Sequence, residues 1–296
     1  MKLSLLSLAA ISVSIAATAA VVSPTRIDKI IAYADSFTDN GNVFSHTNFP
    51  PTPPYYQGRF SNGPTWLEYV NQNLIGVAVM NYGYAYATTN NVDVYSQVGN
   101  YIVPGLKQQV ETIFVNGTSK DLYVIFFGYN DLNAILNPNI YYTINKRYSK
   151  EKVVQNVIES VQQLVKMYGA KHFLIMTAPP FDQFPAFKGI RQQETTQLIK
   201  DYNALLQSRL LQKVKGVDIK FLDDNAWLLE QLAHPEKVNV KTTSEPCVWG
   251  LGNTTSCDDA ENHFFWDSFH PTTKVHQAMG EWVVSQLKGL YELKHH

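Results

Sequence analysis

Three short polar segments of this chain combine the residue types that acyl transfer requires. Asp35 and Ser36 come at the end of the apolar run IIAYA, and Asn130 follows the apolar run LYVIFFG. Asp267 and His270 stand just before the last helical pattern of the chain. Together the segments supply a hydroxyl, an amide, a carboxylate and an imidazole. This set of groups predicts nucleophilic attack on a carbonyl carbon.

Each of four side chains would have a definite task in such a reaction. The hydroxyl of Ser36 becomes a good nucleophile only when a neighbouring base takes its proton, and His270 can do so near neutral pH. Asp267 would hold the imidazole in the right tautomer and stabilise its charged form. Asn130 would donate an N–H group to the oxyanion that develops on the carbonyl oxygen.

Each segment also has a structural interpretation. Ser36 could be a turn or N-cap residue, and Asn130 a turn residue. Asp267 could cap the following helix, and His270 could lie on the surface. The catalytic interpretation is favoured because all three segments fall at expected ends of strands or helices. Parallel sheets place their ligand sites at the carboxyl ends of strands.

Apolar strand patterns alternate with amphipathic helix patterns along the chain, which predicts an α/β fold with a parallel sheet. Five strands are expected at residues 29–35, 77–83, 122–128, 172–179 and 218–224. Three long helices are expected at residues 150–169, 189–216 and 271–293.

Two less regular segments interrupt this alternation. Residues 44–63 and 234–266 are expected to form long loops. No internal repeat or low-complexity linker divides the chain. Residues 21–296 are therefore predicted to form a single domain.

The first twenty residues, 1–20, are predicted to be a signal peptide. Lys2 is followed by the apolar stretch LSLLSLAAISVSIAA and by small residues up to Ala20, which is the pattern of a cleaved secretory leader. A membrane anchor is the alternative, but the stretch is short for a bilayer span. No later stretch is long and apolar enough to be one. The chain is therefore expected to be secreted, without a stable membrane anchor.

The cysteines and sequons suit an oxidising compartment. Cys247 and Cys257 are close in sequence and are expected to pair as a disulfide. A metal site is not expected, because no CxxC motif or histidine cluster accompanies the cysteines. Asn116 and Asn253 each begin an N-glycosylation sequon, which is relevant only in a eukaryotic host.

The composition argues against a nucleic-acid partner. The 296-residue chain has a formal net charge of −1, and its 24 Lys and Arg residues are scattered. A nucleic-acid surface would need a basic stripe. Only 17% of the residues are charged, while 17 are tyrosine and 15 are phenylalanine. This balance suits a protein that handles neutral ligands.

In its motifs the chain resembles the GDSL, or SGNH, hydrolases. ADSFTDNGN resembles the first block of that family, FFGYNDL its G-x-N-D block and WDSFHPTTKVH its D-x-x-H-P block. GRFSNGPTWLEYV and NYGYAYATTN are also similar to one subgroup, the secreted fungal acetylesterases and related lysophospholipase-like esterases. The similarity runs from about Ile30 to the last helix.

The resemblance implies a flavodoxin-like three-layer α/β/α sandwich with a five-stranded parallel sheet. It also implies that Ser36 is the nucleophile, that His270 is the general base and that Asp267 orients the imidazole. Asn130 and the backbone N–H of Ser36 would bind the oxyanion. No metal or organic cofactor would be needed.

Two positions depart from the family pattern. Ala34 stands where the family usually has glycine, which would strain the turn if that turn required a positive φ. Ala85 and Tyr86 stand where the subgroup usually has two glycines, one of which offers its N–H to the oxyanion. The N–H of Tyr86 is expected to take this role, although Gly83 fits under a shifted alignment. The phenol ring is expected to shrink the acyl pocket and to reduce or alter activity.

The leading interpretation is a secreted serine esterase whose partner is a small-molecule ester. Acetyl or other short-chain esters of plant-wall saccharides are the substrates that the resemblance favours. One alternative is a lipolytic, lysophospholipase-like esterase, and another is a catalytically impaired binding protein on the same fold. A metal-dependent hydrolase is disfavoured because the histidines lack ligand spacing.

Five further residues receive mainly structural interpretations. Trp66 is expected to pack at a helix start, and Arg59 is expected to form a salt bridge in a loop. Asp35 is expected to fix the nucleophile turn through hydrogen bonds. His263 and His276 are expected at the surface, and a position near the cleft is the alternative for either.

Overall fold

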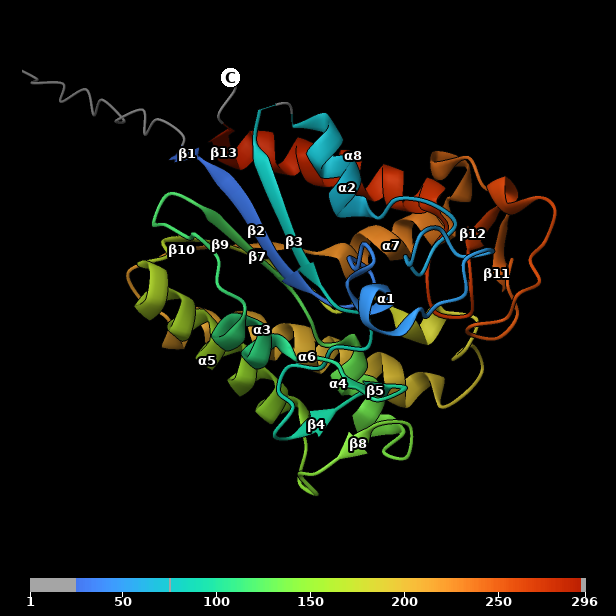
Figure 1. Ribbon diagram of the computed structural model, residues 1–296, viewed down its shortest axis with the longest axis horizontal. Helices are drawn as coiled ribbons and strands as arrows, with labels where there is room; N and C mark the ends of the chain where they lie inside the picture. Colours follow the sequence, from blue (N-terminus) through green and yellow to red (C-terminus); the bar gives the residue numbers. More distant parts are fainter. Residues whose placement is uncertain (1–24, 75, 294–296) are drawn as a thin grey trace, which may run out of the picture.

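The computed structural model describes residues 25–74 and 76–293, so the predicted signal peptide lies outside the described residues. At its centre is a five-stranded sheet of order β10-β9-β7-β2-β3 in which all neighbours are parallel (Figure 1). The strands are β2 (Lys29–Ala34), β3 (Ala78–Gly83), β7 (Leu122–Phe126), β9 (His172–Met176) and β10 (Asp218–Leu222). The predicted five-stranded parallel sheet is confirmed.

The central position of β7 explains its sequence. All five of its residues, LYVIF, are buried. A parallel strand covered by helices on both faces needs such a continuous apolar run. Of the five strands in this sheet, β2 comes first along the chain, yet it pairs with both β3 and β7. The strand order therefore reverses beside β2, and ligand sites of open parallel sheets lie at such a reversal.

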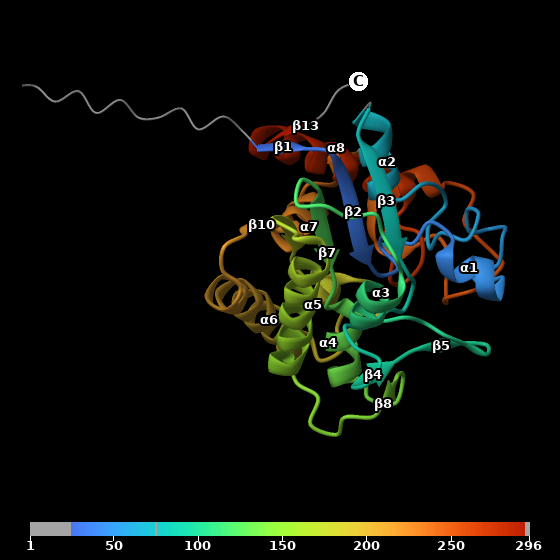
Figure 2. The same ribbon diagram turned by 60° about the vertical axis from the view of Figure 1, so that its left-hand side comes forward.

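Helices cover both faces of the sheet, which confirms the three-layer α/β/α sandwich (Figures 1 and 2). One layer contains α2 (Trp66–Asn73), α7 (Asp224–Ala233) and α8 (Thr273–Leu290). The other contains α3 (Leu106–Thr112), α4 (Tyr129–Leu136), α5 (Lys150–Tyr168) and α6 (Gln192–Lys213). The three long predicted helices are present as α5, α6 and α8.

The sequence patterns did not predict α3, α4 or α7. Each has ten residues or fewer, and helices of this length depend on tertiary packing more than on their own propensity. The expected loop at residues 44–63 also overlaps a short helix, α1 (Asn42–Thr47).

The segment expected as a loop at residues 234–266 is more ordered than predicted. It contains β11 (Thr242–Pro246), which pairs in parallel with β12 (His263–Phe265). A 3₁₀ turn precedes each strand of this pair, Pro235–Val238 before β11 and Ala260–Asn262 before β12. A third 3₁₀ turn, Phe181–Gln183, lies elsewhere, after β9.

Three further strand pairs are short. They are β1 (Thr25–Ile27) with β13 (Tyr291–Leu293), β4 (Val94–Tyr95) with β8 (Tyr142–Thr143), and β5 (Gln97–Val98) with β6 (Tyr101–Ile102). The β1–β13 pair brings both ends of the described chain side by side (Figure 2).

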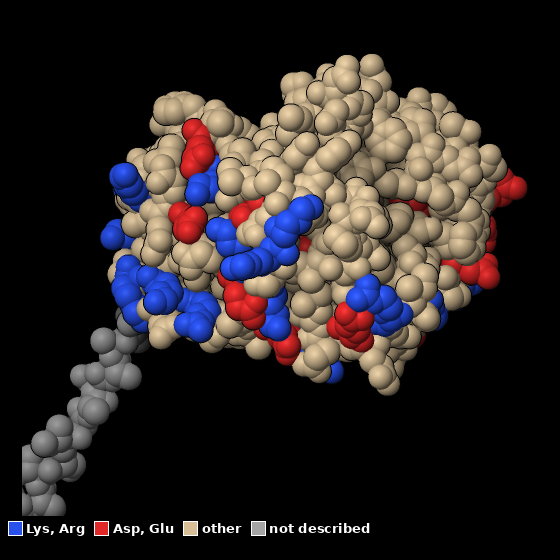
Figure 3. All heavy atoms as spheres, turned by 90° about the horizontal axis from the view of Figure 1, so that it is seen from below, with Lys and Arg blue, Asp and Glu red and all other residues tan. Residues whose placement is uncertain are grey.

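The surface carries charges of both signs. On the face drawn in Figure 3, Lys and Arg lie interspersed with Asp and Glu over the left side and the lower part, and a broad upper area carries neither. Within residues 25–74 and 76–293, no helix is both long enough and apolar enough to cross a bilayer.

Candidate active site

Ser36 lies in a tight turn directly after β2. The carbonyl oxygen of Asp35 accepts hydrogen bonds from the N–H groups of Thr38 and Asp39, both at 3.0 Å. The Asp35 carboxylate accepts a third bond, from the Phe37 N–H at 3.1 Å. These bonds close the turn around Ser36, as predicted for Asp35.

Ser36, His270 and Asp267 form one hydrogen-bonded series. His270 Nε2 lies 2.8 Å from Ser36 Oγ, and His270 Nδ1 lies 2.9 and 3.0 Å from the two carboxylate oxygens of Asp267. A carboxylate at Nδ1 favours the tautomer with its proton on that nitrogen. Nε2 is then free to accept the hydroxyl proton, which is the arrangement that general-base activation requires.

The carboxylate of Asp267 is fully buried and held at both oxygens. Its Oδ1 accepts hydrogen bonds from the N–H groups of Phe269 at 2.8 Å and His270 at 2.9 Å. Its Oδ2 accepts one from the Tyr55 hydroxyl at 3.0 Å. The sequence patterns gave no indication of Tyr55, because it stands in a proline-rich loop and meets Asp267 only through the fold.

Aromatic rings surround the imidazole of His270. The rings of Phe60 and Phe37 lie 5.1 and 5.9 Å from it between centroids, and the ring of Phe269 lies at 6.3 Å. Such surroundings lower the local dielectric, which strengthens charge interactions within the hydrogen-bonded series.

Asn130 lies in the first turn of α4, not in a loop turn. Its Nδ2 donates to the Ala87 carbonyl at 2.9 Å and lies 3.4 Å from Asp35 Oδ2, and its Oδ1 accepts from the Tyr141 hydroxyl at 2.8 Å. The preceding Gly128 has φ +130°, and a Cβ there would lie 2.6 Å from the ring of Tyr202. The glycine thus permits the close turn from β7 into α4. Tyr141, like Tyr55, was not found from the sequence.

The two departures from the family pattern have different structural outcomes. Ala34 ends β2 and has no positive φ, so the alanine does not strain the turn. Tyr86 has φ +67°, a left-handed conformation that favours glycine. The segment carrying it is tied to the nucleophile turn, because the Ala85 N–H donates to Asp39 Oδ2 at 2.8 Å.

Two candidates for the second backbone oxyanion donor can be compared. The Gly83 N–H already donates to Asn81 Oδ1 at 2.8 Å. Among the described residues, neither the Tyr86 N–H nor the Ser36 N–H has a hydrogen-bond acceptor. Tyr86 also lines the same cavity as Ser36, whereas Gly83 does not. The geometry therefore favours Tyr86 over Gly83.

A cavity of about 100 Å³ opens beside Ser36. Its walls are mostly aromatic or aliphatic, and they include the imidazole and amide described above. The lining residues are Ser36, Phe60, Tyr86, Tyr129, Asn130, Asn133, Ile140, Tyr141, Leu251, Phe269 and His270. An apolar pocket with a few convergent polar groups is typical of a small-molecule site.

Three buried carboxyl groups lie around the site with raised pKa values. Burial raises the pKa of Asp35 to about 7, although the Phe37 N–H and the nearby His270 oppose this shift. Burial likewise raises the pKa of Asp39 and of Asp131 to about 6 against their hydrogen bonds. These carboxyl groups hold loops in place, and none is bonded to the Ser36 hydroxyl.

The expectation that His263 and His276 lie at the surface is wrong. His276 is 1% exposed on the inner side of α8, where its ring meets that of Phe37 at 6.2 Å. His263 is 9% exposed in β12.

The expectation that Arg59 forms a salt bridge is confirmed, because it pairs with Glu68 at 2.6 Å. The expectation that Trp66 packs at a helix start is also confirmed, because Trp66 is buried at the first position of α2.

Cys247 and Cys257 form the predicted disulfide. Within the described residues, Cys257, Asp259 and His263 come close enough to hold a metal ion. The sulfur of Cys257 is committed to the disulfide, so it offers no thiolate to a metal. The sequon residues Asn116 and Asn253 are both exposed, and their glycosylation stays a prediction.

The fold and this site together place a hydrogen-bonded serine, histidine and aspartate at the edge of a flavodoxin-like parallel sheet. A family model described as GDSL-like Lipase/Acylhydrolase matches residues 35–283. The chain belongs to this family and is an ester hydrolase.

Relatives of known sequence match nearly the whole chain. The phosphatidylcholine-sterol acyltransferase of Aeromonas hydrophila is 25% identical over 323 residues, covering 93% of this chain and 94% of that protein. The thermolabile hemolysin of Vibrio parahaemolyticus is 25% identical over 302 residues, covering 93% of this chain and 67% of that protein.

Solved structures share the fold at low sequence identity. A protein of Parabacteroides merdae described as a GDSL-like lipase has a TM-score of 0.55 at 11% identity, covering 90% of this chain and 98% of that one. A carbohydrate acetylesterase of Sinorhizobium meliloti has a TM-score of 0.51 at 14% identity, covering 89% and 99%.

Proposed function

We propose that this chain is a secreted serine esterase that hydrolyses short-chain carboxylic esters through an acyl-Ser36 intermediate. The observation that carries the proposal is the buried series from Ser36 Oγ through the His270 imidazole to the Asp267 carboxylate, with contacts of 2.8 to 3.0 Å. Ser36 and His270 line the cavity, and Asp267 lies behind His270, so the series joins a hydroxyl at the cavity wall to a base and a charge partner.

In the first half of the reaction, Ser36 Oγ attacks the ester carbonyl carbon while its proton passes to His270 Nε2. Asp267 stabilises the imidazolium that forms. The negative charge on the carbonyl oxygen is stabilised by the N–H groups of Ser36 and Tyr86. Asn130 Nδ2 keeps its bond to the Ala87 carbonyl and turns its second hydrogen from the long 3.4 Å contact with Asp35 Oδ2 to the oxyanion. When the tetrahedral intermediate collapses, the bond to the alcohol oxygen breaks and that oxygen takes the proton from His270 Nε2.

The second half of the reaction releases the acid. Water takes the place of the alcohol and loses a proton to His270 Nε2 as its oxygen attacks the acyl carbon. The bond between that carbon and Ser36 Oγ then breaks, and Oγ recovers the proton. Loss of one oxyanion donor typically reduces turnover about 10² to 10³-fold.

The size of the cavity supports a short acyl group. Its volume of about 100 Å³ is smaller than the roughly 150 Å³ apolar cavity that accommodates benzene in another protein. Tyr86 contributes to this limit, because its ring packs edge-on against Phe60 at 5.6 Å. Acetyl esters of plant-wall saccharides are our first candidates, by resemblance of the motifs to secreted acetylesterases.

A lipolytic activity is the second candidate. Ile140 lines the cavity and is 67% exposed, so an apolar side chain stands at the entrance. Such a border would suit an acyl chain longer than the cavity can enclose. The relatives described as a phosphatidylcholine-sterol acyltransferase and a hemolysin cover this chain almost completely, which also supports testing lipid esters.

Secretion is part of the proposal. It is supported by the leader pattern of residues 1–20 and by the disulfide between Cys247 and Cys257, since disulfides persist mainly in oxidising compartments. Detection of the processed chain in culture medium of the native host would test it.

The esterase proposal is tested with the chain from residue 21 onward and its Ser36→Ala variant. Nitrophenol release from acetate, butyrate and octanoate esters is measured for both. Acetate turnover that disappears in the variant supports the proposal, and a preference for octanoate shifts it to the lipolytic candidate. Equal rates in both proteins would contradict it and favour a binding protein on a hydrolase fold.

Replacing Tyr86 tests the acyl limit. Tyr86→Gly removes the ring from the cavity and relieves the left-handed backbone, which costs non-glycine residues about 1 kcal/mol. We expect the ratio of octanoate to acetate turnover to rise about tenfold. Tyr84→Phe is the control, since Tyr84 does not line the cavity. An unchanged ratio in Tyr86→Gly would show that the ring does not limit acyl length.

A further inference from the structure

Tyr55 links the site to a distant loop through its hydroxyl group. The side chain is 1% exposed, and its hydroxyl donates to Asp267 Oδ2 at 3.0 Å while accepting the Gly252 N–H at 3.3 Å. Burial and the nearby charge of Asp267 raise the pKa of Tyr55 well above its ordinary value. The hydroxyl therefore keeps its proton and acts as a donor to the carboxylate.

No other hydroxyl or amide group of the described residues could replace the Tyr55 hydroxyl at Asp267 Oδ2. Apart from the His270 imidazole, Tyr55 is the sole described residue that donates to Asp267 Oδ2. Asp267 is 0% exposed, so bulk water does not reach it. A buried carboxylate oxygen that loses its donor keeps a desolvation penalty.

The loop that holds Tyr55 from the other side runs from Cys247 to Cys257 and is closed by the disulfide. Gly252 lies at the middle of this loop. At the loop's base, the Cys247 N–H donates to the Phe265 carbonyl at 3.1 Å. The loop therefore reaches both Tyr55 and the strand that leads to Asp267.

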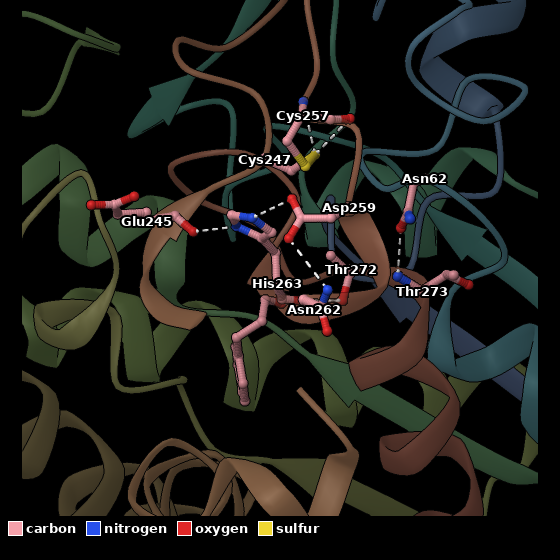
Figure 4. The surroundings of a disulfide bond; sticks show 10 residues. Asn62, Glu245, Cys247, Cys257, Asp259, Asn262, His263, Thr272 and Thr273 are labelled. Carbon is pink, nitrogen blue, oxygen red and sulfur yellow. Dashed lines mark hydrogen bonds and ion pairs between the residues drawn. A yellow bond between two sulfur atoms is a disulfide. The ribbon is translucent and has the colours of Figure 1, made fainter. Parts of the chain in front are cut away.

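Figure 4 shows how the base of the loop is braced beside the disulfide. His263 Nδ1 lies 3.0 Å from the Glu245 carbonyl oxygen, and His263 Nε2 lies 3.3 Å from Asp259 Oδ1. The first contact joins β12 to β11, and the second reaches the residues just after Cys257. These contacts hold β11 and β12 together, and the disulfide is the covalent link between the two ends of the loop itself.

We propose that Tyr55 is a positioning residue that orients Asp267 against His270, and that the disulfide-closed loop 247–257 holds Tyr55 in place. The inference rests on the proposed serine esterase activity. It adds a redox-sensitive support to that site: breaking the disulfide loosens Gly252, and through it the Tyr55 hydroxyl.

Tyr55→Phe is the direct test, because it keeps the ring packed edge-on against Phe60 and Trp266. We expect kcat for nitrophenyl acetate to fall about tenfold with KM unchanged, since loss of orientation affects the chemical step. Active-site titration with an organophosphonate gives the fraction of competent enzyme, so partial unfolding does not imitate this result.

The pH profile of kcat/KM provides a readout that packing alone would not move. Without the Tyr55 hydroxyl, the Asp267 carboxylate accepts one hydrogen bond fewer. Its negative charge is then less neutralised and stabilises the His270 imidazolium more strongly. The acid limb of the profile is therefore expected to move to higher pH. Asp35 and His276 are titratable groups close enough to feel the charge of His270, and both are unchanged in the variant.

Tyr123→Phe is the matched control. Tyr123 is also fully buried, and its hydroxyl makes one hydrogen bond, to the Thr118 carbonyl at 3.1 Å. It lies on β7, outside the residues that line the cavity. Its variant loses a buried hydroxyl and is expected to keep the wild-type kcat and acid limb.

The loop is tested with Cys247→Ser/Cys257→Ser, and independently by reducing the folded wild-type protein with dithiothreitol. Both are expected to lower kcat and to move the acid limb in the same direction as Tyr55→Phe. Combining the cysteine changes with Tyr55→Phe should give less than the product of the separate effects, because both act through one hydroxyl.

The outcomes separate this inference from the proposed function. An active wild-type enzyme with an unshifted acid limb in Tyr55→Phe would overturn the positioning role. Multiplicative effects in the combined variant, or reduction without any effect, would overturn the role of the loop. Absence of Ser36-dependent hydrolysis in the wild-type protein would overturn the proposed function itself, and the inference with it.

Discussion

His270 and His276 are both buried, at 4% and 1% exposure, and both pack near Phe37, yet their hydrogen-bond partners differ. Both ring nitrogens of His270 have partners, Ser36 on one side and Asp267 on the other. Within the described residues, Nδ1 of His276 has no partner. Burial, and secondarily the charge of His270, lowers the pKa of His276 to about 3.

The difference shows what converts a buried histidine into a reactive group. Burial alone disfavours the imidazolium, and a base that cannot hold a proton near neutral pH cannot pass one on. A carboxylate at Nδ1 opposes that penalty and a hydroxyl at Nε2 supplies the proton. The site is therefore defined by its pairings and not by depth in the protein.

The largest expected effect comes from removing the paired imidazole. His270→Gln should lower kcat for nitrophenyl acetate by about 10⁶-fold, since loss of a catalytic base disables the whole series. His276→Gln is the matched control, and we expect its kcat to stay within about threefold of wild type. Comparable losses in the two variants would break the distinction between the histidines.

Asp267→Asn sharpens the comparison, because it removes the charge partner of His270 and makes this histidine more like His276. We expect a loss of about 10⁴-fold in kcat at pH 7, through the wrong tautomer and an unsupported imidazolium. Steady-state kinetics with active-site titration would measure it. A loss below about tenfold would mean that Asp267 does not orient the imidazole.

The smallest expected effect concerns stability at acid pH. The pKa of His276 is lower in the folded state than its ordinary 6.5, so its contribution to stability is present above pH 6.5 and is lost as the pH falls toward 3. His276→Phe removes this loss. The free energy of unfolding of the variant minus that of wild type should be about 2 kcal/mol larger at pH 5 than at pH 7.

Urea unfolding at both pH values would measure this gain. The buried carboxyl groups act with the opposite sign: the pKa values of Asp35, Asp39 and Asp131 are raised in the folded state. Their contribution is present below about pH 3.8 and is lost as the pH rises through about 6 to 7. This contribution of the three carboxyl groups is the same in wild type and in His276→Phe, so it cancels when their free energies of unfolding are subtracted. An equal stability difference at pH 5 and pH 7 would contradict the prediction.

The sequence predicts those parts of the fold whose local pattern matches their final environment. β7 is apolar throughout because both its faces are covered, and α5 shows one apolar face because one face packs. The short helices α3, α4 and α7 were missed, since their stability comes from contacts made elsewhere. His276 had a usable signal: Met279 and Val283 follow it at three- and seven-residue spacing, which places it on the inner face of α8.

The candidate site divides in a similar way. Ser36, Asn130, Asp267 and His270 could be found because each stands at a strand or helix end within a motif. Tyr55 could not, because its contact with Asp267 joins residues 212 positions apart and no local pattern marks it. The left-handed backbone of Tyr86 had an indirect signal, because this tyrosine stands where similar sequences usually have glycine, the residue that favours that conformation.

The separation of 234 positions between Ser36 and His270 has a consequence for biosynthesis. At elongation rates of about 5–20 residues per second, residue 270 follows residue 36 out of the ribosome by roughly 10 to 50 seconds. During that interval the nascent polypeptide carries Ser36, the proposed nucleophile, without its proposed base. The esters of the producing cell are thus not exposed to a working enzyme until translation is almost finished.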